Sequence, residues 1–140
     1  MENERIQTAR TVTAATSDSI DAAAKYLEEY RFLHRMLAMN LYEKKYALRT
    51  EALLPEEKIP GGDALIKARM FEIRRFVLSL GNCNEKVFLI YHYLHGLSVE
   101  KCAEVMEVSR RSAFRIKKRA LAYAGQRLPI YLQERQNGIR

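Results

Sequence analysis

The 140-residue chain contains no tryptophan, two cysteines, three prolines and six glycines. Cys83 and Cys102 form neither a CxxC pair nor a dense disulfide framework, so we expect two reduced thiols and no structural zinc site. No stretch approaches the roughly 18 uninterrupted apolar residues of a membrane span, and no basic-then-apolar leader opens the chain. The sequence therefore predicts a soluble, cytoplasmic protein with the size of one ordinary domain.

The residues that are plentiful favour helices. Ala and Leu together number 32, whereas Val, Ile and Thr together number 20, and no segment keeps the strict alternation of a half-buried strand. The segments between the glycines and prolines can all be helical. The predicted fold class is all-α.

The N-terminal half predicts a flexible arm followed by one long helix. Residues 1–17 lack a periodic apolar stripe, and Ser17 or Asp18 can cap a helix that runs to about Leu53. Its apolar residues follow mixed spacings of three and four, and polar residues interrupt a strict coiled-coil seam. The apolar set is Leu27, Tyr30, Leu33, Leu37, Leu41 and Leu48. The helix either packs on its own domain or mediates dimerisation, and a homodimer is the expected assembly.

A second helix is expected after a loop at residues 53–62, which contain two prolines and two glycines. Asp63 can cap this helix, which runs to about Leu80, and Gly81 then supplies a left-handed C-terminal stop. Residues 18–80 are therefore expected to form a helical hairpin that serves packing or oligomerisation.

Residues 84–128 predict three short helical units. Asn84 can cap the first, which Gly96 ends, while Ser98 and Ser109 can cap the second and third. Two helices joined by so tight a turn cross steeply, as in a helix-turn-helix. Apolar residues stand where these helices should close a small core, namely Cys102, Ala103, Met106, Val108, Ala113 and Ile116.

The positive charge is concentrated near the C-terminus. The formal net charge is +7, and residues 109–140 hold nine bases and one acid, whereas residues 84–108 hold two bases and four acids. The third helical unit is expected to end at Gly125, and residues 129–140 to form a basic tail. A local excess of this size is typical of a surface that binds a polyanion.

The outward face of the third unit is cationic with helical spacing. A helix fits the major groove of DNA, where arginine makes paired hydrogen bonds to guanine and lysine mostly meets phosphate. We expect base contacts near the helix start from Arg110, Arg111, Phe114 and Arg115, where Phe114 either meets a thymine methyl or packs in the core. Phosphate contacts are expected from Ser98, Ser109, Lys117, Lys118 and Arg119.

A family resemblance lies in the run YHYLHGLSVEKCAEVMEVSRRSAFRIKKRALAYAGQRL. It resembles the helix-turn-helix of sigma-70 region 4, especially small phage and prophage regulators similar to the ArpU and RinA late-gene activators. The matching features include the tyrosines before Gly96, then Ala103, Ser109 and the closing Arg119-Ala120-Leu121, and the resemblance covers residues 84–128. The chain departs from that pattern at Glu107, where glycine is common, so Glu107 must adopt an unusual backbone geometry or the turn differs.

The resemblance implies that the protein binds duplex DNA upstream of a promoter and contacts RNA polymerase. A complete sigma factor also needs a promoter-melting domain. Residues 1–83 are too short for one and lack the clustered aromatic residues that it would use. We therefore expect a regulator and not a complete sigma factor.

Catalytic and metal-binding chemistry has little support. His92 and His95 lie three positions apart on one helix, but no third ligand completes a metal motif, and helix-terminal histidines are the commoner explanation. Phosphate-binding glycine loops are absent from the sequence. The sequence predicts no enzyme activity, no cofactor and no metal.

The predicted function is sequence-specific binding of double-stranded DNA by a transcriptional regulator that inserts the helix from Ser109 into the major groove. Two alternatives remain open. One is a phage DNA-packaging protein of the small-terminase kind, and the other is a helical protein-interaction module whose basic helix docks on an acidic partner.

Overall fold

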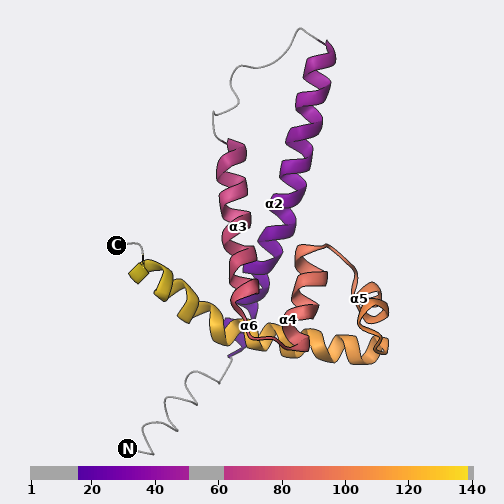
Figure 1. The fold of residues 1–140 in the computed structure, drawn as a ribbon, viewed down its shortest axis with the longest axis vertical. Helices are drawn as coiled ribbons and strands as arrows, with labels where there is room; N and C mark the ends of the chain where they lie inside the picture. The colour runs from indigo at the N-terminus through magenta and orange to yellow at the C-terminus, as the bar shows by residue number, and fades with distance from the viewer. Residues whose placement is uncertain (1–15, 51–61, 139–140) are drawn as a thin grey trace, which may run out of the picture.

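The computed structural model describes residues 16–50 and 62–138. This described part of the chain is all-helical, as the composition predicts, and contains no strand. Figure 1 shows its elements, which in chain order are α2 (Ser17–Thr50), α3 (Gly62–Ser79), α4 (Asn84–Leu89), the π-helix η1 (Ile90–Leu94), α5 (Val99–Met106) and α6 (Arg110–Gly138).

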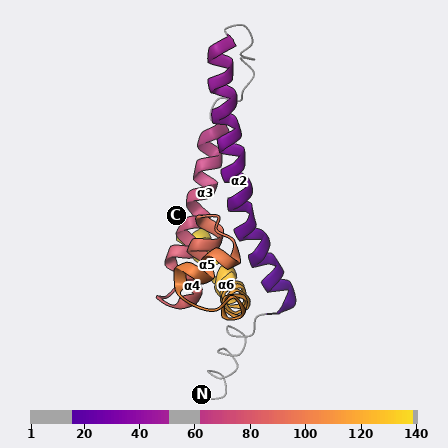
Figure 2. The ribbon, with the colours of Figure 1, turned by 90° about the vertical axis from the view of Figure 1, so that its right-hand side faces the viewer.

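The helices form two groups along α6. α2 and α3 run side by side in opposite directions and project away from α6, whereas α4 and α5 lie along its first half (Figure 1 and Figure 2). The first half of α6 therefore has a different set of neighbours from the rest of the helix.

Both groups share one hydrophobic core. Its buried side chains come from every helix and include Leu27, Phe76, Phe88, Tyr93, Cys102 and Ala113. Burying a side chain such as Leu or Phe contributes about 1.5–3 kcal/mol. The boundary predicted between residues 18–80 and 84–128 therefore does not separate two cores.

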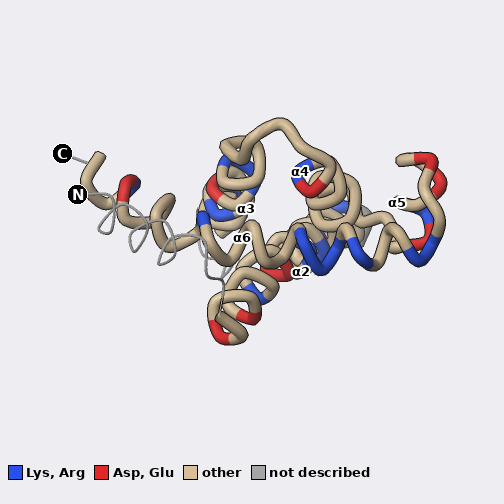
Figure 3. Tube along the Cα trace, turned by 90° about the horizontal axis from the view of Figure 1, so that it is seen from below, with Lys and Arg blue, Asp and Glu red and all other residues tan. Residues whose placement is uncertain are grey.

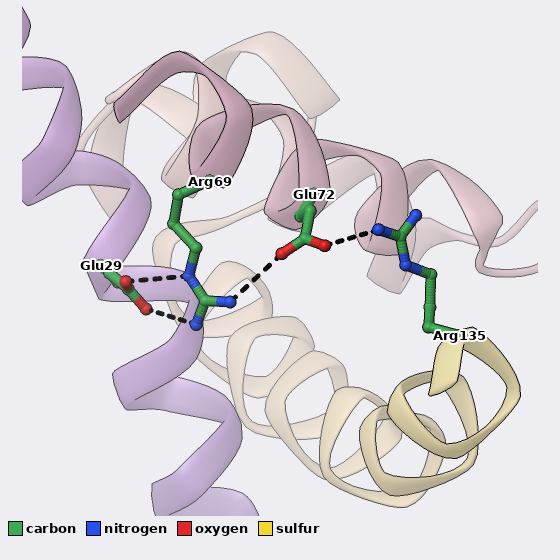
Figure 4. A network of polar contacts seen from close by, with 4 residues as sticks. All are labelled: Glu29, Arg69, Glu72 and Arg135. Carbon is green, nitrogen blue, oxygen red and sulfur yellow. Dashed lines mark hydrogen bonds and ion pairs between the residues drawn. The ribbon is translucent and has the colours of Figure 1, made fainter. Parts of the chain in front are cut away.

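A polar network links α2, α3 and α6 (Figure 4). Arg69 of α3 donates from Nε and Nη2 to the carboxylate of Glu29 on α2, at 3.0 and 2.9 Å. Glu72 accepts from Arg69 Nη1 at 3.4 Å and, through its other oxygen, from Arg135 of α6. Each partly exposed pair contributes little by itself. Together the four side chains join three helices.

Thr16, and not Ser17 or Asp18, caps α2. The Ser19 N–H donates to Thr16 Oγ1 at 3.1 Å, and the Ser19 hydroxyl donates to the Thr16 carbonyl at 2.9 Å. The first of these bonds satisfies one of the N–H groups at the start of α2 that have no partner within the helix. The rest of the expected arm, the expected helix end at Leu53 and residues 53–61 of the expected loop lie outside the described residues.

Asp63 lies in the first turn of α3, which begins one residue earlier at Gly62. Its carboxylate accepts from Asn40 Nδ2 at 3.0 Å and from Lys44 Nζ at 2.7 Å, both on α2. These two bonds fix the start of α3 against residues 40–44 of α2.

The predicted left-handed stop at Gly81 is wrong. Among the described residues, positive φ occurs at Gly96 (73°) and Glu107 (58°). The Gly81 N–H instead donates to the Tyr123 hydroxyl at 3.0 Å, and a β-carbon on residue 81 would lie 3.2 Å from that oxygen. Close approach of α6 therefore explains this glycine.

The predicted Asn84 cap is also wrong. Asn84 is the first residue of α4, and Cys83 precedes it with no side-chain bond to the helix end. Although asparagine is a favourable cap residue, α4 begins at Asn84 itself and not after it.

The predicted helix end at Gly125 and the separate basic tail at 129–140 are wrong, because α6 continues to Gly138. Gly125 is buried, and a β-carbon there would lie 3.0 Å from the Ser19 carbonyl oxygen. This glycine therefore permits the close crossing of α2 over α6. Pro129 cannot donate the usual bond to the carbonyl of Gly125, and Figure 1 shows α6 changing direction along its length.

Candidate nucleic-acid interface

The α5–α6 junction is a three-residue turn with both flanking helices capped. Ser98 Oγ accepts from the Lys101 N–H at 3.1 Å, and Ser109 Oγ accepts from the Ser112 N–H at 3.0 Å, which confirms both predicted caps. Glu107 takes the left-handed conformation that the missing turn glycine required, with φ 58° and ψ 43°. A non-glycine residue pays about 1–2 kcal/mol for this conformation.

The inner side of the junction is apolar. Cys102, Ala103, Ala113 and Ile116 are buried, and the half-buried Met106 and Val108 pack against the same core. The two buried alanines have no side chain beyond Cβ, so α5 and α6 can approach closely. All six residues expected in the small core are therefore on the inner side of the junction.

The outer side of α6 exposes cations. Arg111, Arg115, Lys118 and Arg119 are exposed, and Phe114 between them is 45% exposed. No acidic residue occurs in the sequence between Glu107 and Glu134. Figure 3 shows lysine and arginine positions gathered along the part of α6 that lies beside α4 and α5.

Two of the cations have acidic partners. Arg110 Nη2 lies 3.2 Å from a Glu100 carboxylate oxygen, and its guanidinium lies over the Phe114 ring, 5.7 Å from the centroid. Arg119 Nε lies 3.5 Å from Glu85. The arginine side chains of both pairs are 63–71% exposed, so water and salt screen these contacts strongly.

Arg111, Arg115 and Lys118 make no ion pair with any described residue. The intervals of four and three place them on one face of α6. Their full charges are therefore available to an anion that approaches this face.

Two residues predicted to contact phosphate, Lys117 and Ser109, lie away from the exposed cationic face of α6. Lys117 is half buried, and its charge lies close enough to the buried His92 to help lower the pKa of that imidazole. The Ser109 hydroxyl donates to Ser112 Oγ at 2.9 Å while it also caps α6. Neither side chain shares the outward face of Arg111 and Arg115.

The sequence-based assignment of contacts overlooked the acidic side of the junction. Glu100, Glu104 and Glu107 are all exposed on α5 or in the turn that follows it. Glu104 pairs with Lys101 at 3.1 Å. Such carboxylates repel anions, so an anion is expected to approach α6 on the side away from α5. The net charge of −2 in residues 84–108 was the available signal.

His92 is a structural residue. It is 6% exposed, and its Nδ1 lies 2.7 Å from the Leu97 carbonyl oxygen. A carbonyl only accepts, so Nδ1 carries a hydrogen, and burial lowers the pKa of the ring, which favours its neutral form. The described residues hold no group of three or more His, Cys, Asp or Glu side chains that could bind a metal ion.

Comparison with known proteins found no matching protein family, no matching characterised protein and no matching solved structure. None of the helices in the described ranges is long and apolar enough to span a bilayer. The functional argument therefore rests on the residues of this chain.

Proposed function

We propose that the protein is a transcriptional regulator that binds double-stranded DNA sequence-specifically through the outward face of α6. The observation that carries this proposal is the cationic face of Arg111, Arg115 and Lys118, which is exposed and has no acidic partner among the described residues. The capped three-residue turn before α6 supports a helix-turn-helix docking mode.

The first half of α6 has the dimensions that this role needs. Its 14 residues at positions 110–123 span roughly 21 Å at about 1.5 Å per residue, and the major groove is about 12 Å wide. α2 crosses α6 at Gly125, beyond this half. The outward face of residues 110–123 therefore stays open to a duplex.

The side chains divide into two roles by chemistry. Arg111 and Arg115 are one helical turn apart, and each guanidinium can donate two hydrogen bonds to guanine O6 and N7. Lys118 lies further along the same face and supplies a point charge to phosphate. Arg110 and Arg119 contribute once Glu100 and Glu85 are displaced, because their existing pairs are exposed and weak.

The first test is to identify the DNA. Fragments of the source genome are captured by the full chain and sequenced, and a common motif upstream of promoters is the expected result. Recovery of one packaging site, together with a ring of many subunits by light scattering, would instead support DNA packaging. No retained duplex at low salt would overturn the DNA-binding proposal.

The second test separates base reading from phosphate binding. Arg111→Ala should remove most of the preference for the captured motif over random duplex, a loss of about 5- to 150-fold for one bidentate contact. Lys118→Ala should weaken specific and random binding alike and make the salt dependence shallower by about one phosphate. Arg127→Ala is the control, because Arg127 is an exposed cation in the other half of α6. Equal losses in all three variants would contradict the assigned roles.

A further inference from the structure

α2 exposes an apolar stripe that the protein's own core does not use. Phe32 is 55% exposed, Met39 62%, Tyr42 71% and Tyr46 62%. Their spacings of seven, three and four residues place them on one face of the helix. α3 contacts a different face of α2, where Asn40 and Lys44 bind Asp63.

Two opposite charges flank the centre of this stripe. Arg35 lies four residues before Met39, and Glu43 lies four residues after it. Both side chains are exposed. The pattern is therefore self-complementary when it is read in opposite directions from Met39.

We propose that this stripe binds the same stripe of a second copy of the chain, with the two α2 helices antiparallel and Met39 at the two-fold axis. In this register Phe32 of each copy lies opposite Tyr46 of the other, and Arg35 lies opposite Glu43. Met36 lies opposite Tyr42. Each copy thus presents the same surface, as a two-fold interface requires.

In other registers, charged side chains would lie opposite apolar or like-charged side chains. A shift by about one helical turn in one direction places Glu43 opposite Phe32, and a shift in the other direction places it opposite Met39. Parallel helices in register would place Arg35 opposite Arg35 and Glu43 opposite Glu43. Like charges at such positions repel, and a carboxylate facing an apolar side chain loses solvation. Charge complementarity therefore selects the antiparallel pair.

The size of the stripe indicates a modest affinity. Aromatic side chains bury about 150–250 Å² each, and three of the four stripe residues are aromatic and more than half exposed. Pairing two stripes buries on the order of 1,000 Å², at the lower end of specific interfaces. The interface lies on the part of α2 that projects away from α6 (Figure 1 and Figure 2). It goes beyond the proposed function and does not rest on DNA binding.

Disulfide crosslinking tests the register without DNA. In a Cys83→Ser background, Met39→Cys should crosslink to itself under mild oxidation, because the two copies of residue 39 meet at the axis. Phe32→Cys should not crosslink to itself but should do so with Tyr46→Cys when the two variants are mixed. Efficient self-crosslinking of Phe32→Cys would overturn the antiparallel arrangement.

Charge reversal tests the same pair by sedimentation. Arg35→Glu and Glu43→Arg should each weaken dimerisation at least tenfold, whereas the double variant should return to within about threefold of the parent chain. Lys45→Glu is the control, since Lys45 is exposed on α2 but lies off the stripe. Unchanged circular dichroism checks that the variants stay helical.

A parent chain that stays monomeric at the highest soluble concentration would overturn the dimer, as would a double variant that is no better than the singles. Neither outcome concerns the DNA-binding proposal, which is measured separately on α6. A dimer that forms normally when Arg111→Ala has lost DNA preference would show that the two surfaces are independent.

Discussion

The first half of α6, residues 110–123, and the second half, residues 124–138, both carry arginine, but their arginines have different surroundings. In the second half Arg135 pairs with Glu72, and Tyr131 lies against Phe76 with ring centroids 5.2 Å apart. In the first half Arg111 and Arg115 face solvent without an ion pair among the described residues.

This contrast shows how one helix can serve two purposes. The second half packs α6 against α2 and α3. The first half packs against α4 and α5 with its inner side and exposes cationic side chains on its outer side. Charge separates the two halves as well, because residues 110–123 hold six Lys or Arg side chains and no acid, whereas residues 124–138 hold two arginines and Glu134.

The largest expected effect comes from removing the anchor of the second half. Phe76→Ala should lower the free energy of unfolding by about 3–5 kcal/mol, because a fully buried ring between Tyr26 and Tyr131 is lost. Urea unfolding followed by circular dichroism measures the change. Phe71→Ala on the same helix, where the ring is 62% exposed, should change it by less than about 0.5 kcal/mol. Equal effects of the two variants would contradict the anchoring role.

A smaller effect is expected at the crossing between the two halves. Gly125→Ala should destabilise the fold by about 1–2 kcal/mol, because the new β-carbon would lie 3.0 Å from the Ser19 carbonyl oxygen and 3.2 Å from the Ile20 nitrogen. The better helix propensity of alanine offsets only part of that cost. Gly138→Ala meets no neighbour within 4 Å, so it should be neutral or slightly stabilising. A stabilising Gly125→Ala in thermal unfolding would show that the crossing is loose.

His92 makes the packing behind the first half sensitive to acid. Burial is the main cause of its lowered pKa, with the charges of Lys117 and Arg31 adding to it, whereas the Leu97 carbonyl and Glu28 act in the opposite direction. As the pH falls below the usual value of 6.5, His92 binds a proton more readily in the unfolded chain than in the folded chain. This contribution to stability is therefore complete above that pH and is lost as the pH falls.

Thermal unfolding at about pH 7.5 and about pH 5.5 measures this dependence. His92→Asn, whose amide can still donate to the Leu97 carbonyl, should flatten it. His34→Asn, at an exposed histidine of α2, should leave it as in the parent chain. An unaltered pH dependence in His92→Asn would remove His92 as its origin.

The smallest expected effect is a change in affinity for DNA when a paired cation of the first half loses its acidic partner. Glu100→Gln should release Arg110 and remove an acid near the DNA, which raises affinity for duplex by up to about fivefold, as an exposed pair is worth about 0–1 kcal/mol. Glu134→Gln makes the same change in net charge in the second half and should have little effect. Fluorescence anisotropy at low salt compares the two. An equal gain from both would indicate an effect of total charge and not of position.

Much of the junction could be predicted from the sequence. Ser98, Ser109 and Gly96 act through bonds or dihedral angles within a few residues of themselves, and all three predictions are confirmed. The left-handed Glu107 follows from the same local geometry. These signals are local because the bonding partner is near in sequence. The same kind of signal nevertheless misplaced the first residues of α2 and α4, where Thr16 and Cys83 precede the helices.

The surroundings of Gly81, Gly125 and Lys117 could not be predicted from their neighbours in sequence. Gly81 and Gly125 were interpreted as helix stops, yet each accommodates a distant group, the Tyr123 hydroxyl in one case and the backbone of Ser19 in the other. Lys117 was grouped with the outward cations, but it is half buried and its charge contributes to the lowered pKa of the buried His92. Each of these three placements depends on a residue far along the chain.

The amino-acid order by itself determined the all-α fold of the described residues, the caps of α5 and α6, and the accumulation of positive charge in the last quarter of the sequence. Only the tertiary structure decided that α6 continues through Gly125 and Pro129, and which of its cations have acidic partners. The reason is that helix formation and capping depend on neighbours in sequence. Burial and ion pairing depend on which distant segments the packing brings together.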